Sequence, residues 1–207
     1  MDSNLRTKRE SFIRREHVRY RRNPGCIPGP DEVLLPDQAG LQVAESDTPL
    51  MEQMVSDFVT FCATCMGVTL TTPSDAPCIR LRLTGKGSRY DVLDPASDGF
   101  SIHVGDGGVD VEADYPRGLL HATHYLERLM ADRGGPVLPR GHRDIIPSFA
   151  PRITTVCGFE WSDEYLSLLS HFGASGVMIV VELARYATSS RIPEWGDGQE
   201  AAKNCAE

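Results

Sequence analysis

The hydrophobic period changes from two residues to about 3.6 within residues 98–130, and this change most constrains the fold of the chain. Alternating apolar side chains predict two half-buried strands, at 100–104 and 109–113. The glycine-rich loop Gly105–Gly108 between them is short and accepts positive φ. We therefore expect an antiparallel hairpin, followed by an amphipathic helix whose apolar side chains recur at helical spacing over 119–129.

The predicted helix carries polar residues on its other face and should end at Gly134. His121 and His124 lie three residues apart on this face and could seed a metal site. No third ligand can be named from the sequence. We therefore interpret the two histidines as part of a solvated helix face, and we predict no metal.

Composition and charge predict a globular protein whose N-terminal segment is basic. Apolar residues make up 41% of the 207 positions, which is enough for a substantial core. No run of about 18 apolar residues predicts a membrane span. Residues 1–22 hold eight basic and three acidic residues and lack the apolar core of a signal peptide. We expect a cytoplasmic protein with no membrane partner.

Six cysteines are scattered over predicted helices, strands and tail, so we expect reduced thiols. Cys62 and Cys65 have the spacing of a redox or metal pair. They lie in an apolar helix without a second such pair or a nearby histidine, and free cysteine often acts as a small buried apolar residue. We interpret them as core residues and predict no cofactor.

Breaker residues and changes of period divide the chain into five segments. We predict a basic flexible arm over 1–30 and an α+β domain over 31–140. A linker should follow over 141–151, then the first βαβ unit of an incomplete (β/α)8 barrel over 152–193, and an irregular tail over 194–207. The α+β domain should contain an antiparallel-rich sheet with two helices on one face.

Inside the predicted domain, the first strand could lie at 32–35 or at 41–44. Thr48 has the character of an N-cap, and the helix that follows should reach Gly67. Alternation then predicts another strand at 79–83.

The βαβ unit is predicted from a different pattern. Residues 152–156 form a short apolar strand, 165–172 read as a helix, and 177–181 are continuously apolar. Continuous apolar strands are typical of parallel sheets that are buried on both faces. A (β/α)8 barrel needs roughly 250 residues, so the sequence contains only the start of one.

Several stretches resemble the N-terminal region of family 20 β-N-acetylhexosaminidases and, next to these, of α-glucuronidases. The likeness covers roughly residues 31–190 and lies in the pattern of apolar positions and glycines at 99–102, 109–113, 118–120, 125–129 and the linker 146–152. The resemblance implies an accessory domain that leads into a barrel, and a glycoside hydrolase activity on O-glycosyl bonds in the complete homologue.

The resemblance also implies where catalysis would occur. These hexosaminidases place an adjacent Asp-Glu pair after the fourth barrel strand, whereas this chain reaches only the second. We therefore predict no catalytic residue in this chain and no turnover by it. Asp163 and Glu164 are adjacent, but acids at a helix start favour the dipole and the cap, so we interpret them as structural.

Saccharide contacts would come from the ends of the two barrel strands, because barrel active sites are assembled at the C-terminal ends of strands. Aromatic and charged side chains follow both strands and suit the apolar faces and hydroxyl groups of a carbohydrate. The predicted substrate-binding residues are Phe159, Glu160, Trp161, Glu182, Arg185 and Tyr186. Arg152, at the beginning of the first strand, is interpreted as structural.

Two other function classes stay open. The chain could be a noncatalytic carbohydrate-associated or structural module. Alternatively, the arginines of the basic arm could contact nucleic acid, although the acidic remainder of the chain argues against tight binding. Neither a Gly-x-Ser-x-Gly elbow nor an HExxH motif occurs, so serine hydrolase and zinc protease classes lack support.

Overall fold

The computed structural model describes residues 21–43, 48–71, 77–85, 90–156 and 163–179. The chain divides into two compact units. The first comprises residues 1–152 and 161–175, and the second comprises residues 153–160 and 176–207. The described part of the first unit contains the sheet and the helices, and that of the second contains a pair of strands.

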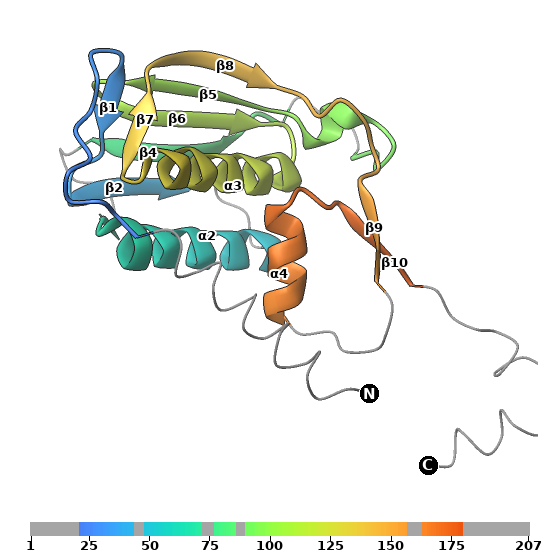
Figure 1. The fold of residues 1–207 in the computed structure, drawn as a ribbon. Coiled ribbons are helices and arrows are strands. Elements are labelled where there is room, and N and C mark those ends of the chain that lie inside the picture. Colours follow the sequence, from blue (N-terminus) through green and yellow to red (C-terminus); the bar gives the residue numbers. More distant parts are fainter. Residues whose placement is uncertain (1–20, 44–47, 72–76, 86–89, 157–162, 180–207) are drawn as a thin grey trace, which may run out of the picture. The chain divides into compact units, whose positions relative to one another are not determined.

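A six-stranded mixed sheet forms the body of the first unit (Figure 1). Its strand order is β3-β2-β4-β6-β5-β8. The strands are β2 (Gln38–Val43), β3 (Thr69–Thr71), β4 (Cys78–Leu83), β5 (Phe100–Gly105), β6 (Gly108–Ala113) and β8 (Gly141–Ile145).

The sheet corrects the expectation that it would be antiparallel-rich. β2 pairs in parallel with both β3 and β4, and β4 pairs in parallel with β6. Only the β5–β6 and β5–β8 pairs within the described sheet are antiparallel. For the β2–β3 pair, the reason is the helix between the two strands, since a helical crossover returns the chain in the same direction.

The predicted hairpin is confirmed as β5 and β6. The two strands pair in register from Phe100 opposite Ala113 to Gly105 opposite Gly108, which leaves a two-residue turn. Local alternation and turn chemistry were sufficient to find it because both strands and the turn are contiguous in sequence. Residues 141–145, predicted as part of the linker, form β8 and extend the sheet beside β5.

Helices α2 (Pro49–Phe61) and α3 (Pro116–Arg133) lie next to each other on the same face of the sheet (Figure 1). This confirms the predicted pair. Thr48 caps α2 by accepting a hydrogen bond from the Met51 amide at 3.4 Å. After α2 the chain continues as a π-helical segment, η1 (Cys62–Met66), before a left-handed Gly67 ends the helical run.

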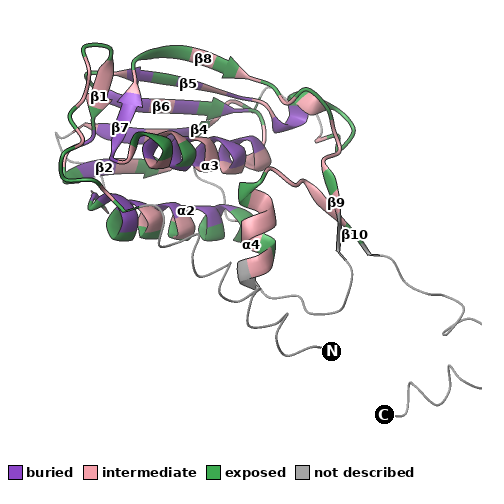
Figure 2. Cartoon of the chain, viewed as in Figure 1, coloured by how far each residue is buried: buried purple, intermediate pink, exposed green. Residues whose placement is uncertain are grey.

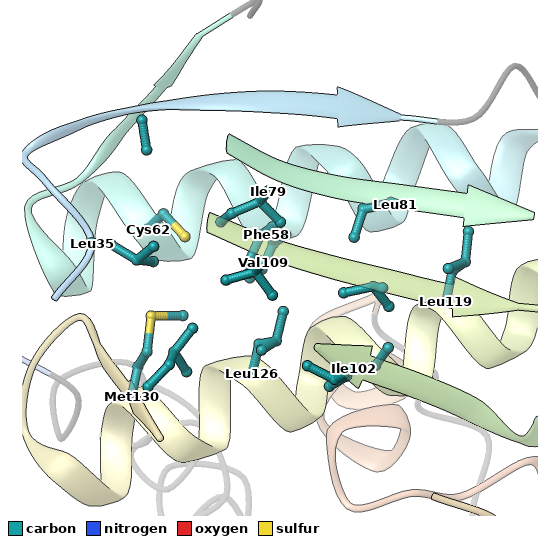
Figure 3. Close-up of a cluster of buried hydrophobic side chains, with 14 of the residues drawn as sticks. Leu35, Phe58, Cys62, Ile79, Leu81, Ile102, Val109, Leu119, Leu126 and Met130 are labelled. Atoms are coloured by element: carbon teal, nitrogen blue, oxygen red, sulfur yellow. The ribbon is translucent and has the colours of Figure 1, made fainter. Parts of the chain in front are cut away.

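The apolar faces of sheet and helices form one core (Figures 2 and 3). Alternate residues of the central strands point toward the helices and are almost fully buried. They pack with Phe58 of α2 and with Leu126 and Met130 of α3. Full burial of such a side chain contributes about 1.5–3 kcal/mol. The strand residues of this core include Ile79, Leu81, Ile102, Val104, Val109 and Val111.

The cysteines near the end of α2 belong to this core. Cys62 is completely buried and Cys65 is 7% exposed. Burial raises the pKa of the Cys62 thiol far above its ordinary value, and the nearby charge of Glu127 acts in the same direction. Such a thiol is a poor nucleophile. Among the described cysteines, Cys26, Cys62, Cys65 and Cys78 are free thiols.

Residues before the sheet also pack on the domain. Strands occur near both predicted positions of the first strand, 32–35 and 41–44. At the first position, β1 (Glu32–Leu34) pairs with β7 (Val137–Pro139), separately from the main sheet that contains β2. The amide of Arg22 donates to the Cys65 carbonyl at 2.7 Å, and that of Asn23 donates to the Gly134 carbonyl at 2.8 Å. The part of the predicted arm after Arg21 is therefore held by the domain, and residues 1–20 lie outside the described residues.

The second unit contains β9 (Ile153–Val156) and β10 (Gly176–Ile179), which pair in parallel. Helix α4 (Asp163–His171) lies between these two strands in the sequence. It belongs to the first unit. The predicted strand, helix, strand order is thus present, with parallel strands. Among the described residues, no helix combines the length and the hydropathy needed to cross a bilayer.

Gly108, at the start of β6, offers a direct test of the sheet. A Cβ atom at this position would clash with the backbone of Cys78 in β4. The φ angle of Gly108 is +116°, which side-chain-bearing residues rarely adopt. We expect Gly108→Ala to lower the free energy of unfolding by about 2–4 kcal/mol, measured by urea denaturation. Gly107→Ala is the matched control, because no atom lies within 4 Å of its added Cβ. Equal stability of the two variants would show that β4 and β6 do not approach as described.

Candidate functional site

A polar stripe on α3, consisting of His121, His124 and Glu127, faces other parts of the first unit. These residues recur every third position and so share one side of the helix. The prediction of a solvated face is wrong for His121, which is 8% exposed, and Glu127 beside it is 6% exposed. Their partners, Arg152 and His171, come from later in the chain. Periodicity within a helix gives no information about such partners.

Asp98 is the centre of a buried ionic cluster at one end of this stripe. It ends the short helix η2 (Pro95–Asp98), and its side chain is 3% exposed. Nη2 of Arg152 donates to Oδ2 of Asp98 at 2.8 Å. The Tyr90 hydroxyl donates to Oδ1 at 3.1 Å, and Nε of Arg117 lies 3.6 Å from the same oxygen.

The cluster favours an ionised carboxylate. Burial alone would raise the pKa of Asp98, but the guanidinium groups of Arg117 and Arg152 beside it hold this pKa well below its ordinary value. Asp98 is therefore a poor proton donor, and its role is electrostatic. The same Arg152 Nη2 lies 2.8 Å from Nε2 of His121. A guanidinium nitrogen can only donate, so this histidine nitrogen is the acceptor.

Arg152 and Ser175 extend the cluster to the residues that precede β9 and β10. The Arg152 amide donates to Oγ of Ser175 at 2.7 Å, and the Ser175 amide donates to the Arg152 carbonyl at 2.7 Å. Arg117 donates to the Ser175 carbonyl at 2.9 Å. We call Asp98, Arg117, Arg152 and Ser175 the Asp98 anchor. Its geometry agrees with the interpretation of Arg152 as structural.

A second candidate is a shallow hollow of about 340 Å³ on the sheet face opposite the helices. Arg80 and Asp110 form a two-point ion pair there, with nitrogen to oxygen distances of 2.5 and 2.8 Å. Arg82 also lies 3.6 Å from Asp110 and 3.8 Å from Glu112, so the arginines that line the hollow are paired with its carboxylates. The lining residues are Arg80, Arg82, Ser101, His103, Asp110, Glu112 and His142.

The predicted saccharide-binding residues cannot be placed with respect to either candidate. Phe159, Glu160, Trp161, Glu182, Arg185 and Tyr186 all lie outside the described residues. Within the residues that the structure describes, no group of three or more His, Cys, Asp or Glu side chains is arranged to hold a metal ion.

Solved structures of glycoside hydrolases contain a similar arrangement of sheet and helices. The N-acetyl-β-hexosaminidase of Streptomyces plicatus, solved with thio-NAglucal, aligns with a TM-score of 0.57 over 78% of this chain and 34% of its own, at 18% identity. The chitobiase of Flavobacterium johnsoniae, also of family 20, aligns with a TM-score of 0.59 over 81% of this chain and 28% of its own, at 14% identity. The chain shares its fold with family 20 glycoside hydrolases.

The same fold occurs beyond family 20. A family 138 enzyme that targets pectin rhamnogalacturonan II aligns with a TM-score of 0.54 over 80% of this chain and 22% of its own, at 12% identity. This chain therefore spans about a third or less of the length of these glycoside hydrolases. The sequence itself matches no family model and no curated protein.

The Asp98 anchor was missed by sequence analysis because its members are spread from residue 98 to residue 175 and share no motif. One weak signal existed: Asp98 directly precedes the Gly99-Phe100 start of an apolar strand, where a charged side chain must find a partner or water. Nothing in the sequence names Arg152 as that partner.

The anchor predicts a large loss of stability in the variant Asp98→Asn. Two guanidinium groups would lose their buried counter-charge, so the free energy of unfolding at pH 7 should fall by about 3 kcal/mol in urea denaturation. Because the pKa of Asp98 is lowered in the folded protein, this difference should be complete above about pH 4 and shrink as the pH falls further.

Asp144→Asn is the control for this prediction. Asp144 pairs with His142 at 3.1 Å, but its side chain is 73% exposed. Such surface pairs contribute little, and the variant should stay within about 0.5 kcal/mol of the parent protein. A similarly small effect of Asp98→Asn would mean that the anchor does not hold the structure together.

Proposed function

We propose that this chain is the N-terminal part of a glycoside hydrolase-like protein of carbohydrate metabolism, in which β9, α4 and β10 begin a (β/α)8 barrel. In this proposal, the sheet domain is the accessory domain and supports the first barrel strands. The chain itself carries no catalytic carboxylate pair, and the complete protein would hydrolyse O-glycosyl bonds.

The observation that carries the proposal is the order of the elements together with the extent of the fold likeness. The match to the Streptomyces plicatus enzyme covers 78% of 207 residues, or about 161. This is longer than the sheet domain from residue 31 to residue 152. Alignment of that length favours the inclusion of residues outside the sheet domain, where the parallel strands β9 and β10 lie.

The Asp98 anchor supports the proposed accessory role. It holds Arg152 and Ser175, the residues that directly precede β9 and β10, by hydrogen bonds and a buried ion pair. In a (β/α)8 barrel, the strand beginnings stabilise the fold and the strand ends carry the chemistry. An anchor before the two strands is therefore where a supporting domain would act.

Substrate contacts are proposed at the other ends of these strands, from Phe159, Glu160, Trp161, Glu182, Arg185 and Tyr186. The solved hexosaminidase complexes contain thio-NAglucal or GlcNAc, so an N-acetylated sugar is the first ligand to test. Asp163 is the first residue of α4, in keeping with its interpretation as part of a helix start and not of a catalytic pair.

The test begins with the reading frame on the 3′ side of the Glu207 codon. We expect a continuation that encodes further barrel strands and an adjacent Asp-Glu pair, and we expect the protein made from it to hydrolyse p-nitrophenyl N-acetyl-β-glucosaminide or a related glycoside. The 207-residue chain alone should show no turnover. Turnover by the chain alone, or a full-length protein without glycosidase activity, would contradict the proposal.

The two tryptophans provide a matched pair of variants for the substrate-binding residues. Trp161 belongs to the proposed site, whereas Trp195 lies in the segment predicted as an irregular tail. In the active full-length protein, Trp161→Ala should lower kcat/KM by about tenfold or more, since loss of one aromatic contact costs on the order of 1–2 kcal/mol. Trp195→Ala should leave it unchanged. Equal effects would exclude Trp161 from the site.

A further inference from the structure

The other end of the polar stripe contains a three-residue cluster that joins α3 to α4. His171, the last residue of α4, directs Nε2 toward Oε2 of Glu127 at 2.9 Å and Nδ1 toward the Ser167 carbonyl at 2.7 Å. A carboxylate oxygen and a carbonyl oxygen can only accept hydrogen bonds. Both ring nitrogens must therefore donate, and only the protonated imidazolium form has two N–H groups.

The neighbouring histidine is held in the neutral form. The ring of His124 stacks on that of His171, with 3.8 Å between centroids and 25° between planes. Burial lowers the pKa of His124 to about 3, and the nearby charge of His171 acts in the same direction. Its Nδ1 is buried without a hydrogen-bond partner in the described structure, as expected for an unprotonated nitrogen. The stacked pair thus carries one positive charge, on His171.

Glu127 makes that charge necessary. Its side chain is 7% exposed, and His171 is its hydrogen-bond donor among the described residues. If His171 lost a proton, one of its ring nitrogens would present a lone pair to an oxygen lone pair. Either the buried carboxylate or the Ser167 carbonyl would then lose its donor, which is costly for a buried acceptor.

We propose that His124, Glu127 and His171 form a pH-sensitive latch, which holds α4 on α3 while His171 is protonated and loosens when that proton is lost. The latch is a proposal separate from the carbohydrate activity, because its three residues belong to α3 and α4 and none of them is among the proposed substrate-binding residues.

The direction of the pH effect follows from the surroundings of His171. Burial alone would lower its pKa, but the hydrogen bond and the charge of Glu127 raise it above the ordinary value. Asp57 of α2 and the Ser167 carbonyl of α4 also favour the protonated form. A raised pKa in the folded state means that the contribution of the latch is complete below about pH 6.5 and is lost as the pH rises through the folded value.

Amide hydrogen exchange on the full chain tests this latch. Protection of the α4 peptide 163–171, corrected for intrinsic exchange rates, should fall several-fold between pH 5.5 and pH 8.5, because the raised pKa of His171 lies within this range. Protection of the hairpin peptide 100–113 should stay constant. Protection of α4 that does not change with pH would overturn the proposal.

Two histidine variants separate the latch from general effects of pH. His171→Gln can still donate a hydrogen bond to Glu127 but cannot titrate, so the protection of α4 should become independent of pH. His142→Gln changes a histidine on β8 whose side chain is 57% exposed, and it should retain the pH dependence of the parent protein. Persistence of the pH dependence in His171→Gln would assign it to another group and overturn the proposal.

A direct titration keeps the proposal testable if His171→Gln fails to fold. NMR titration of the histidine Hε1 signals in the parent chain should show His171 with a pKa above 6.5 and His124 without titration between pH 5 and pH 9. A pKa of His171 at or below 6.5, or protonation of His124 in that range, would contradict the arrangement of charges described above.

Discussion

Burial of a single face of the mixed sheet is the constraint on which the rest of the first unit depends. Six strands present apolar side chains to α2 and α3 on one face and polar side chains on the other. Because the two helices cover that one face side by side, the side of α3 turned away from the core is free to bind later parts of the chain. The polar stripe lies on this side of α3. Its hydrogen bonds and ion pairs join α3 to Arg152 and to His171, outside the apolar core.

The elements that the sequence predicted correctly are those whose determinants are local. The β5–β6 hairpin, the Thr48 cap and the Gly134 end of α3 each depend on residues within a few positions. The parallel pairing of β4, the addition of β8 and the β1–β7 pair depend on contacts between distant segments. For the same reason, His121 was assigned to a solvated face, since its partner Arg152 lies 31 residues later.

A shared fold and a shared substrate depend on different features of a protein. The likeness to family 20 and family 138 enzymes establishes an arrangement of strands and helices that serves different glycoside hydrolases. It does not transfer a substrate, because sites are built by particular side chains on a shared fold. The described part of this chain has a buried polar contact at each end of the polar stripe: Asp98 with Arg152 at one end, and Glu127 with His171 at the other.

The hydrogen bonds of Arg22 and Asn23 define where this domain begins. Two successive backbone amides bind the last carbonyls of two different helical runs, one at Cys65 and one at Gly134. Carbonyls at helix ends otherwise depend on water or side-chain donors. A shortened protein that starts at residue 31, where the sequence alone would place the boundary, would leave both helix ends without these donors. The smallest version that preserves both helix ends must therefore start before Arg22.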